Sequence, residues 1–215
     1  GGEEAFKKAI SLNPNHAEAH AYYSHLLHIV GRPDEAMTHI QKALELDPLN
    51  SLVRALYGID LTLARRYDEA VNAFQDSREL DPAQSVAGNS NIAEALWLAG
   101  KEDEALETWL KDFTNPGYIK ALKEGFAEAG FAGAHKGFAE ARAERSKRTY
   151  IKPMGIADSY ARGGDFDNSL LWLEKAYQEH DPNLPYIAPD PIYDEVRADP
   201  RFQDLLRRMN LPERR

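Results

Sequence analysis

Prolines recur along this chain at a fixed interval, and that interval restricts the possible folds more than any other feature of the sequence. Pro14, Pro48, Pro82 and Pro116 each lie 34 residues from the next, and each follows Asp or Asn. A stretch of this length accommodates one helix–turn–helix unit, and proline ends the second helix because it cannot continue one. The spacing therefore predicts stacked helical hairpins, in which each unit contacts mainly its neighbours.

The residues between these prolines repeat an order of small and large side chains. Small residues such as Ser24, Ala36 and Gly58 allow two helices to approach closely, and the large residues fill the space between units. The matching positions are Tyr23, Ser24, Leu27, Ala36, Ile40 and Ala43 in residues 17–48, and Tyr57, Gly58, Leu61, Ala70, Phe74 and Ser77 in residues 51–82. We expect the large residues at such positions to be buried, namely Tyr57, Phe74, Trp109 and Leu173.

This order of residues resembles the tetratricopeptide repeat (TPR) family. The resemblance implies an all-α fold, a right-handed α–α superhelix built as a TPR-like solenoid of stacked helical hairpins. A third unit keeps the pattern after a one-residue slip, and a later unit shows it again; their matching positions are Ile92, Ala93, Leu96, Gly100, Ala105 and Trp109, then Ile156, Ala157, Tyr160, Gly164, Ser169, Leu173 and Ala176. Asp112 stands where the motif has a small packed residue. Since burying an unpaired carboxylate is costly, we expect the helix to end early and leave Asp112 exposed or capping a neighbour.

These patterns divide the chain into four parts. Residues 1–116 form the regular array, a partial first repeat followed by three repeats, and residues 117–149 form a degenerate helical hairpin. Residues 150–182 are a further TPR-like repeat, and residues 183–215 are capping helices over its apolar face. The tail resembles repeat regions of bacterial multidomain signalling and transcription regulators. Because residues 3–14 match only the second helix of a unit, we expect the chain to be a fragment of a larger protein.

Composition excludes several classes of function. The net charge of −9 argues against a nucleic-acid partner, because phosphate neutralisation requires an excess of Lys and Arg. One basic run at residues 142–152 is interleaved with glutamates, which is typical of a solvated helix face. No apolar run approaches the roughly 20 residues of a membrane span, so no membrane partner is expected. The absence of cysteine rules out disulfides and fits a cytoplasmic protein.

No motif in the sequence carries catalytic chemistry, so we expect a non-enzyme without cofactors or metals. Phosphate-binding loops, zinc-protease helices and nucleophile elbows are all missing. Gly163 to Phe166 has the letters of a cyclic-dinucleotide cyclase signature, but it falls at the turn between two helices. His25 and His28 share a helix face and offer a metal-binding alternative, for which Glu18 and His39 would have to supply further ligands.

The first helix of each hairpin lines the concave side of such a solenoid, and that side is the expected binding surface. By the geometry of the family, its residues are Glu18, Tyr22, His25, His28, Ile59, Thr62, Leu63, Asn91, Glu94, Trp97, Asp158 and Arg162. A mixed apolar, aromatic and acidic groove suits a protein or peptide ligand, and its acidic members favour a basic one. An obstruction of the groove by residues 117–149 is the competing expectation.

We therefore interpret the chain as a scaffold for protein–protein interaction. Two alternatives remain open. The incomplete amino-terminal repeat exposes an apolar edge through which two copies of the chain can associate as a homodimer. The repeats can also recruit substrates for an enzyme whose catalytic domain lies outside this chain.

Overall fold

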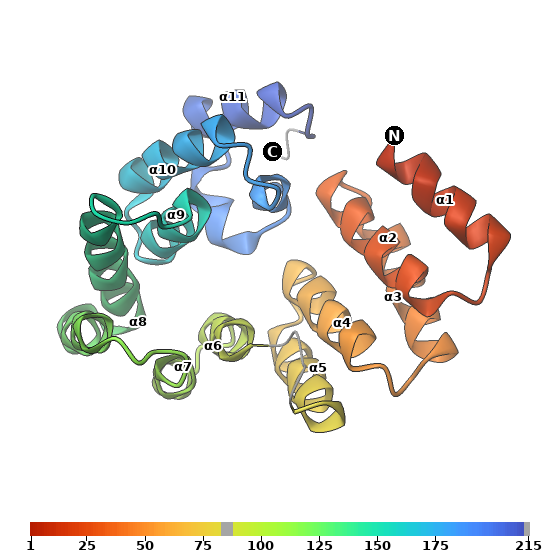
Figure 1. Cartoon of the computed structure of the whole chain (residues 1–215), viewed down its shortest axis with the longest axis horizontal. Helices are drawn as coiled ribbons and strands as arrows, with labels where there is room; N and C mark the ends of the chain where they lie inside the picture. The colour runs from red at the N-terminus through yellow and green to blue at the C-terminus, as the bar shows by residue number, and fades with distance from the viewer. Residues whose placement is uncertain (83–87, 213–215) are drawn as a thin grey trace. The chain divides into compact units, whose positions relative to one another are not determined.

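A computed structural model of the protein describes residues 1–82 and 88–212, and all regular secondary structure in these residues is helical. They contain eleven α-helices and two 3-10 helices, with no β-strand in either range. The chain divides into two compact units, Gly1–Trp109 and Leu110–Arg215. Figure 1 shows the helices in chain order. The expected all-α helical-repeat fold is confirmed.

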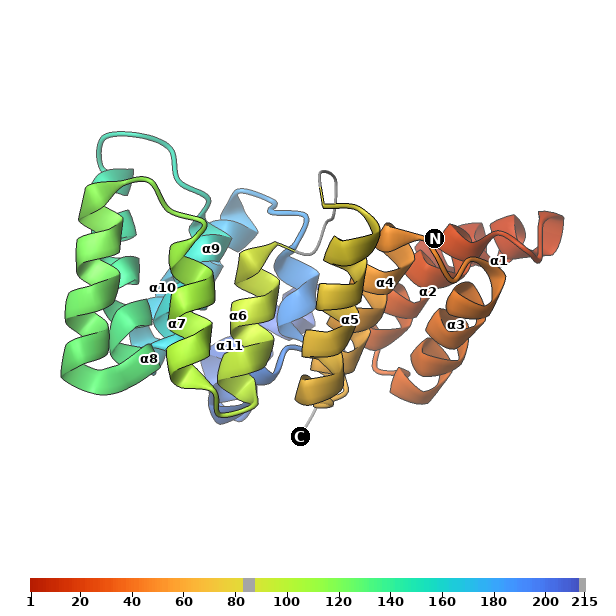
Figure 2. The same ribbon diagram turned by 90° about the horizontal axis from the view of Figure 1, so that it is seen from below.

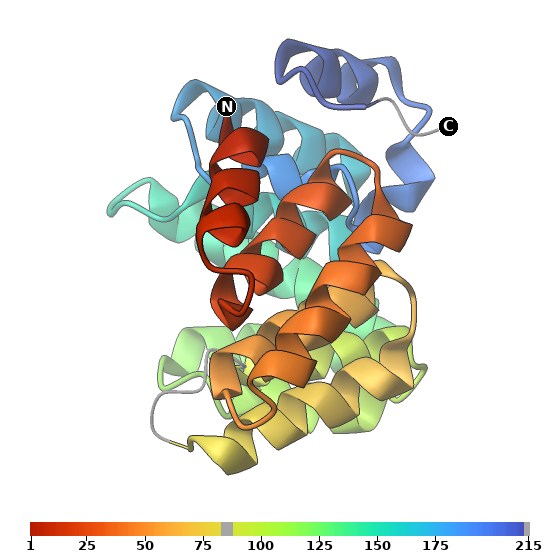
Figure 3. The ribbon, with the colours of Figure 1, turned by 90° about the vertical axis from the view of Figure 1, so that its right-hand side faces the viewer.

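The first unit contains seven helices in succession. They are α1 (Gly2–Leu12), α2 (Ala17–Ile29), α3 (Pro33–Leu46), α4 (Ser51–Leu63), α5 (Tyr67–Leu80), α6 (Asn89–Leu98) and α7 (Glu102–Leu110). α2 pairs with α3 and α4 pairs with α5, and α2 also packs against α4. In Figure 2, α3 and α5 lie in front with α2 and α4 behind them, and Figure 3 shows α1 beside the α2–α3 pair.

Left-handed residues mark the turn inside each hairpin of this unit. Gly31, Arg65 and Gly100 have φ angles of 81°, 63° and 79°. The first two are 34 residues apart and the last two are 35 apart, which is the one-residue slip seen in the third unit of the sequence. α7 ends at Leu110, and Asp112 is exposed beyond it, as the sequence predicts.

The packing between paired helices follows the small and large positions of the motif. Phe74 is 1% exposed and lies against Gly58, where an added Cβ would stand 2.5 Å from the phenylalanine ring. Trp109 and Leu173 are also buried, as expected. Tyr57 is less enclosed than these residues, since its side chain is partly buried. Phe74 occupies the inner space beside Gly58, and Tyr57 packs on the rim of the neighbouring apolar cluster.

The second unit begins with α8 (Pro116–Ser146), which consists of two helices joined by a kink at Ala129 and Gly130. The two halves pack backbone against backbone, since a Cβ added at Gly125 would lie 2.2 Å from the carbonyl oxygen of Gly133. Only glycine permits this approach. The pair α9 (Pro153–Arg162) and α10 (Phe166–Gln178) follows, and α8 packs against α9.

A tail of short helices covers α9 and α10. It consists of the 3-10 helices η1 (Leu184–Ile187) and η2 (Pro191–Val196), followed by α11 (Pro200–Arg208). η2 packs on α9, while η1 and α11 pack on α10. Tyr193 and Phe202 are fully buried and stack with their ring centroids 5.6 Å apart. The tail therefore encloses an apolar core of its own against the last helix pair.

Candidate functional site

The first helices of unit 1 carry eight of the residues expected on the binding surface in partly or fully accessible positions. Tyr22 on α2 is 43% exposed and is the most accessible aromatic side chain among them. The other seven are neither buried nor fully exposed: Glu18 on α2; Ile59, Thr62 and Leu63 on α4; and Asn91, Glu94 and Trp97 on α6. Because α2 packs against α4, their accessible residues lie on neighbouring helices.

The α4 portion of this surface is chiefly apolar. Ile59 packs against the cluster that contains Ala17 and Ala21 and keeps part of its surface accessible. Thr62 donates its hydroxyl proton to the carbonyl oxygen of Gly58 at 2.9 Å. That hydrogen bond leaves Thr62 no proton for a ligand, so α4 offers mainly aliphatic contacts.

His25 and His28 do not line an accessible surface, which corrects the expectation for these two residues. They are 5% and 1% exposed and lie in the seam between α2 and α4. Their Nε2 atoms are 3.3 and 3.6 Å from Oδ1 of Asp60, a fully buried carboxyl group on α4. Burial lowers the pKa of His25 to about 4. The histidines belong to the packing of unit 1, beneath the surface that a ligand would reach.

Asp60 is the residue that the sequence analysis missed. One signal for it was present, because Asp60 is a lone carboxyl group between Ile59 and Leu61 in an otherwise apolar turn. The position of Asp60 also accounts for the inward orientation of the two histidines. Oδ1 of Asp60, contributed by the next repeat, gives both imidazole rings a polar neighbour inside the seam.

The metal-binding alternative finds no support in the arrangement of these side chains. His39 faces His20, with 2.9 Å between their Nδ1 atoms. Across residues 1–82 and 88–212, no group of three or more His, Asp or Glu side chains is arranged to hold a metal ion. In the same ranges, no helix has the length and apolar character needed to cross a membrane.

The two expected site residues on α9 belong to unit 2, and one of them is engaged by the tail. Tyr193 donates its hydroxyl proton to Oδ1 of Asp158 at 2.7 Å, and Tyr193 is fully buried. Asp158 keeps part of its surface accessible, but one of its carboxyl oxygens is already engaged by the tail. Arg162 is partly exposed. The candidate binding surface is therefore confined to unit 1.

The basic run is less solvated than expected. Arg142 is half-buried and donates from Nη1 to the carbonyl oxygen of Gly155 at 2.7 Å, and its guanidinium lies 5.2 Å from the ring centroid of Phe138. This arginine joins α8 to α9. Lys147 and Arg148 are exposed, as a solvated face requires.

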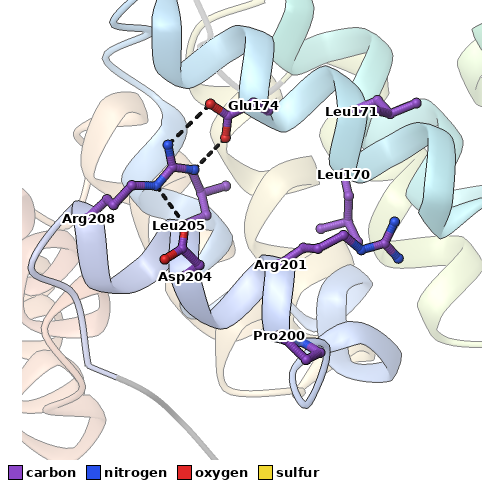
Figure 4. A pocket seen from close by; sticks show the side chains of 8 residues that line it. All are labelled: Leu170, Leu171, Glu174, Pro200, Arg201, Asp204, Leu205 and Arg208. Atoms are coloured by element: carbon purple, nitrogen blue, oxygen red, sulfur yellow. Dashed lines mark hydrogen bonds and ion pairs between the residues drawn. The ribbon is translucent and has the colours of Figure 1, made fainter.

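Unit 2 contains a separate groove of about 440 Å³ between α10 and α11 (Figure 4). Leu170, Leu171 and Leu205 give it an apolar surface, and Leu171 is 67% exposed. Arg208 lies on one side, paired with Glu174 and, at 3.0 Å, with Asp204. Arg201 pairs with Asp167 at 2.7 Å. The groove therefore offers apolar contacts flanked by charges that already have partners.

This chain consists of helix pairs that stack in succession, with part of the first helix of each pair accessible, and such an arrangement is that of a helical-repeat protein. Two models described as tetratricopeptide repeat match the chain, over residues 2–58 and 63–118, together more than half of its 215 residues. The chain therefore belongs to the tetratricopeptide repeat family, whose domains are generally non-catalytic modules for protein–protein interaction.

The solved structure of YrrB agrees with this assignment at the level of the fold. YrrB, described as a TPR protein with an unusual peptide-binding site, is 21% identical to the chain with a TM-score of 0.50, and the match covers 86% of this chain and 98% of YrrB. MamA is 18% identical with a TM-score of 0.45, covering 85% of this chain and 89% of MamA. No curated protein matches the chain in sequence.

Proposed function

We propose that the accessible first-helix face of unit 1 binds a peptide segment of a partner protein. This face comprises Glu18, Tyr22, Ile59, Thr62, Leu63, Asn91, Glu94 and Trp97. The observation that carries the proposal is the exposure of Tyr22 on α2, next to a helix whose accessible residues are chiefly aliphatic. Aromatic and apolar groups left accessible on a helical-repeat surface are better accounted for by a partner than by folding.

The charge of this face favours a basic peptide. Glu18 and Glu94 both retain accessible surface, and no Lys or Arg belongs to the face. Pairs between exposed charges are screened by salt over a Debye length of about 8 Å at physiological ionic strength. The affinity for a basic ligand should therefore fall as salt is added, while the contribution of Tyr22 should persist.

The test selects ligands from random peptides displayed on phage and measures their affinities by fluorescence anisotropy. We expect Tyr22→Ser and Glu94→Lys to weaken binding, with Glu94→Lys also removing most of the salt dependence. Glu79→Lys is the matched control, because it makes the same charge change at an exposed position of α5, a second helix. Equal affinities for all three variants, with unchanged circular dichroism, would contradict the proposal.

A second candidate is self-association through α1. No residue of α1 is buried, and Leu12 is 73% exposed. An exposed apolar edge of this kind suits a second copy of the chain. Sedimentation across a concentration series tests this, because Leu12→Ser should lower the apparent mass if the edge is an interface. A third candidate is the recruitment of substrates for an enzyme whose catalytic domain lies outside this chain. The resemblance of the tail to signalling regulators favours such a larger protein.

A further inference from the structure

Four polar residues lie fully enclosed between α2 and α4. Ser24 and Asp60 are 0% exposed, and His25 and His28 adjoin them in the same seam. Buried polar groups are costly unless their hydrogen bonds are made, so the positions of the protons in this cluster matter to the fold. The distances around Ser24 determine one of these positions.

Ser24 Oγ lies 2.6 Å from the carbonyl oxygen of Ala21 and 2.5 Å from Oδ2 of Asp60. A serine hydroxyl has one proton to donate, and a carbonyl oxygen can only accept. Both contacts can be hydrogen bonds at once only if Ser24 gives its single proton to Ala21. The short contact with Asp60 then requires that Oδ2 of Asp60 carry a proton and donate it to Ser24.

The adjacent histidine is not placed to take this proton. His25 Nε2 lies 3.3 Å from the carbonyl oxygen of Leu56, which accepts only, so Nε2 already carries a hydrogen. Burial lowers the pKa of His25 to about 4, which keeps the ring neutral at ordinary pH. A neutral His25 also suits a neutral carboxyl group on the other side of the seam.

We propose that Asp60 is a neutral carboxylic acid that bridges α2 and α4 through Ser24, and that its ionisation makes this seam sensitive to pH. The bridge ties the first repeat to the second. A carboxylate formed there could accept only the proton that Ser24 donates to Ala21, so one of the two short contacts would lose its hydrogen. Ionisation of Asp60 would therefore weaken the seam. The proposal does not depend on the identity of any ligand of the protein.

The titratable groups facing Asp60 are His25 and His28 of α2. No charged side chain of α3 or α5, the other helices packed against α4, contacts it within the described residues. Burial accordingly raises the pKa of Asp60 well above its ordinary value of 3.8.

The direction of the pH effect follows from linkage. Because the pKa of Asp60 is higher in the folded chain, the folded chain keeps a proton that the unfolded chain has released. The contribution of the neutral acid is complete below about pH 3.8 and is lost as the pH rises through the folded-state pKa. His25 titrates in the opposite sense, since its contribution is lost as the pH falls from about 6.5 towards 4.

The test compares the wild type with Asp60→Asn by urea unfolding between about pH 4 and pH 8. Asparagine has the shape of the neutral acid and donates to Ser24 at every pH, and both chains retain His25. We expect the ratio of the wild-type to the variant folding constant to fall by up to about tenfold per pH unit above pH 4. Asp34→Asn, at an exposed position of α3, is the matched control and should not reproduce this fall.

A ratio that stays level or rises with pH would overturn the proposal, because a carboxylate paired with a histidine behaves in that way. If Asp60→Asn fails to fold, carbon-detected NMR of the wild type decides the question. The side-chain carboxyl carbon of Asp60 should keep the resonance of a neutral acid at a pH where free aspartate side chains are already ionised. A carboxylate resonance at that pH would show that the proton is absent.

Discussion

Phe74 shows how a single packed position of the repeat motif stabilises the fold. Its ring is 1% exposed and fills the space that the missing side chain of Gly58 leaves open. Truncation to alanine removes apolar burial and leaves a cavity, so Phe74→Ala should cost roughly 3–5 kcal/mol of unfolding free energy. Urea unfolding measures this cost. Leu49→Ala, at a position 76% exposed, should change little, and equal stability of the two variants would disprove the packing role.

Tyr193 tests the attachment of the tail to α9. Its buried hydroxyl donates to Asp158, and Tyr193→Phe removes this hydrogen bond while keeping the ring stacked on Phe202. We expect a loss of about 0.5–1.5 kcal/mol in thermal or urea unfolding. Tyr22→Phe is the control, because the Tyr22 side chain is substantially exposed. If Tyr193→Phe is as stable as the wild type, the hydrogen bond to Asp158 does not contribute to the attachment of the tail.

Individual residues also show what could be predicted from the sequence and what could not. The motif predicted the burial of Phe74, Trp109 and Leu173, because packed positions repeat with the helix period. It did not predict that His25 and His28 turn inward. Their orientation depends on Asp60, which lies more than thirty residues away on another helix. Spacing along one helix gives a shared face, and the neighbour that meets this face follows from tertiary packing.

At the scale of elements, the two halves of α8 depend on a close backbone contact that the sequence did not reveal. A methyl group at Gly125 would lie 2.2 Å from the carbonyl oxygen of Gly133. Gly125→Ala must therefore push the helices apart, and overpacking of this kind costs about 1–3 kcal/mol. Gly2→Ala is a matched substitution in α1, with no atom closer than 3.9 Å. Calorimetry should show a lower melting temperature for Gly125→Ala alone; two equal melts would exclude the contact.

The positions of α1 to α5 could be predicted from the sequence, because Asp-Pro and Asn-Pro pairs and left-handed turn residues mark the ends of these helices. The path of the tail was harder to predict. η1 and η2 are short 3-10 helices rich in proline, and they owe their form to the core that they enclose. A regular hydrophobic period was absent there, so the sequence indicated a cap but not its path over α9.

At the scale of the whole molecule, the sequence predicted the class of fold, and the proposed binding surface lies on first helices of the repeats that the sequence indicated. It did not predict which surface residues remain accessible. Four of the twelve expected residues do not belong to the accessible face of unit 1. His25 and His28 are enclosed in a seam, while Asp158 and Arg162 lie in unit 2, where Asp158 accepts a hydrogen bond from the tail. The remaining eight lie on α2, α4 and α6 of unit 1.

The most direct test of the proposed binding surface is an NMR titration of the full isotope-labelled chain with a phage-selected basic peptide. The account predicts that the largest amide shifts fall on α2, α4 and α6, around Tyr22, Ile59 and Glu94, and that added salt reduces the affinity. Glu79 on α5 provides the internal control and should shift little. Shifts concentrated on α3 and α5, or around Leu171 between α10 and α11, would contradict the account.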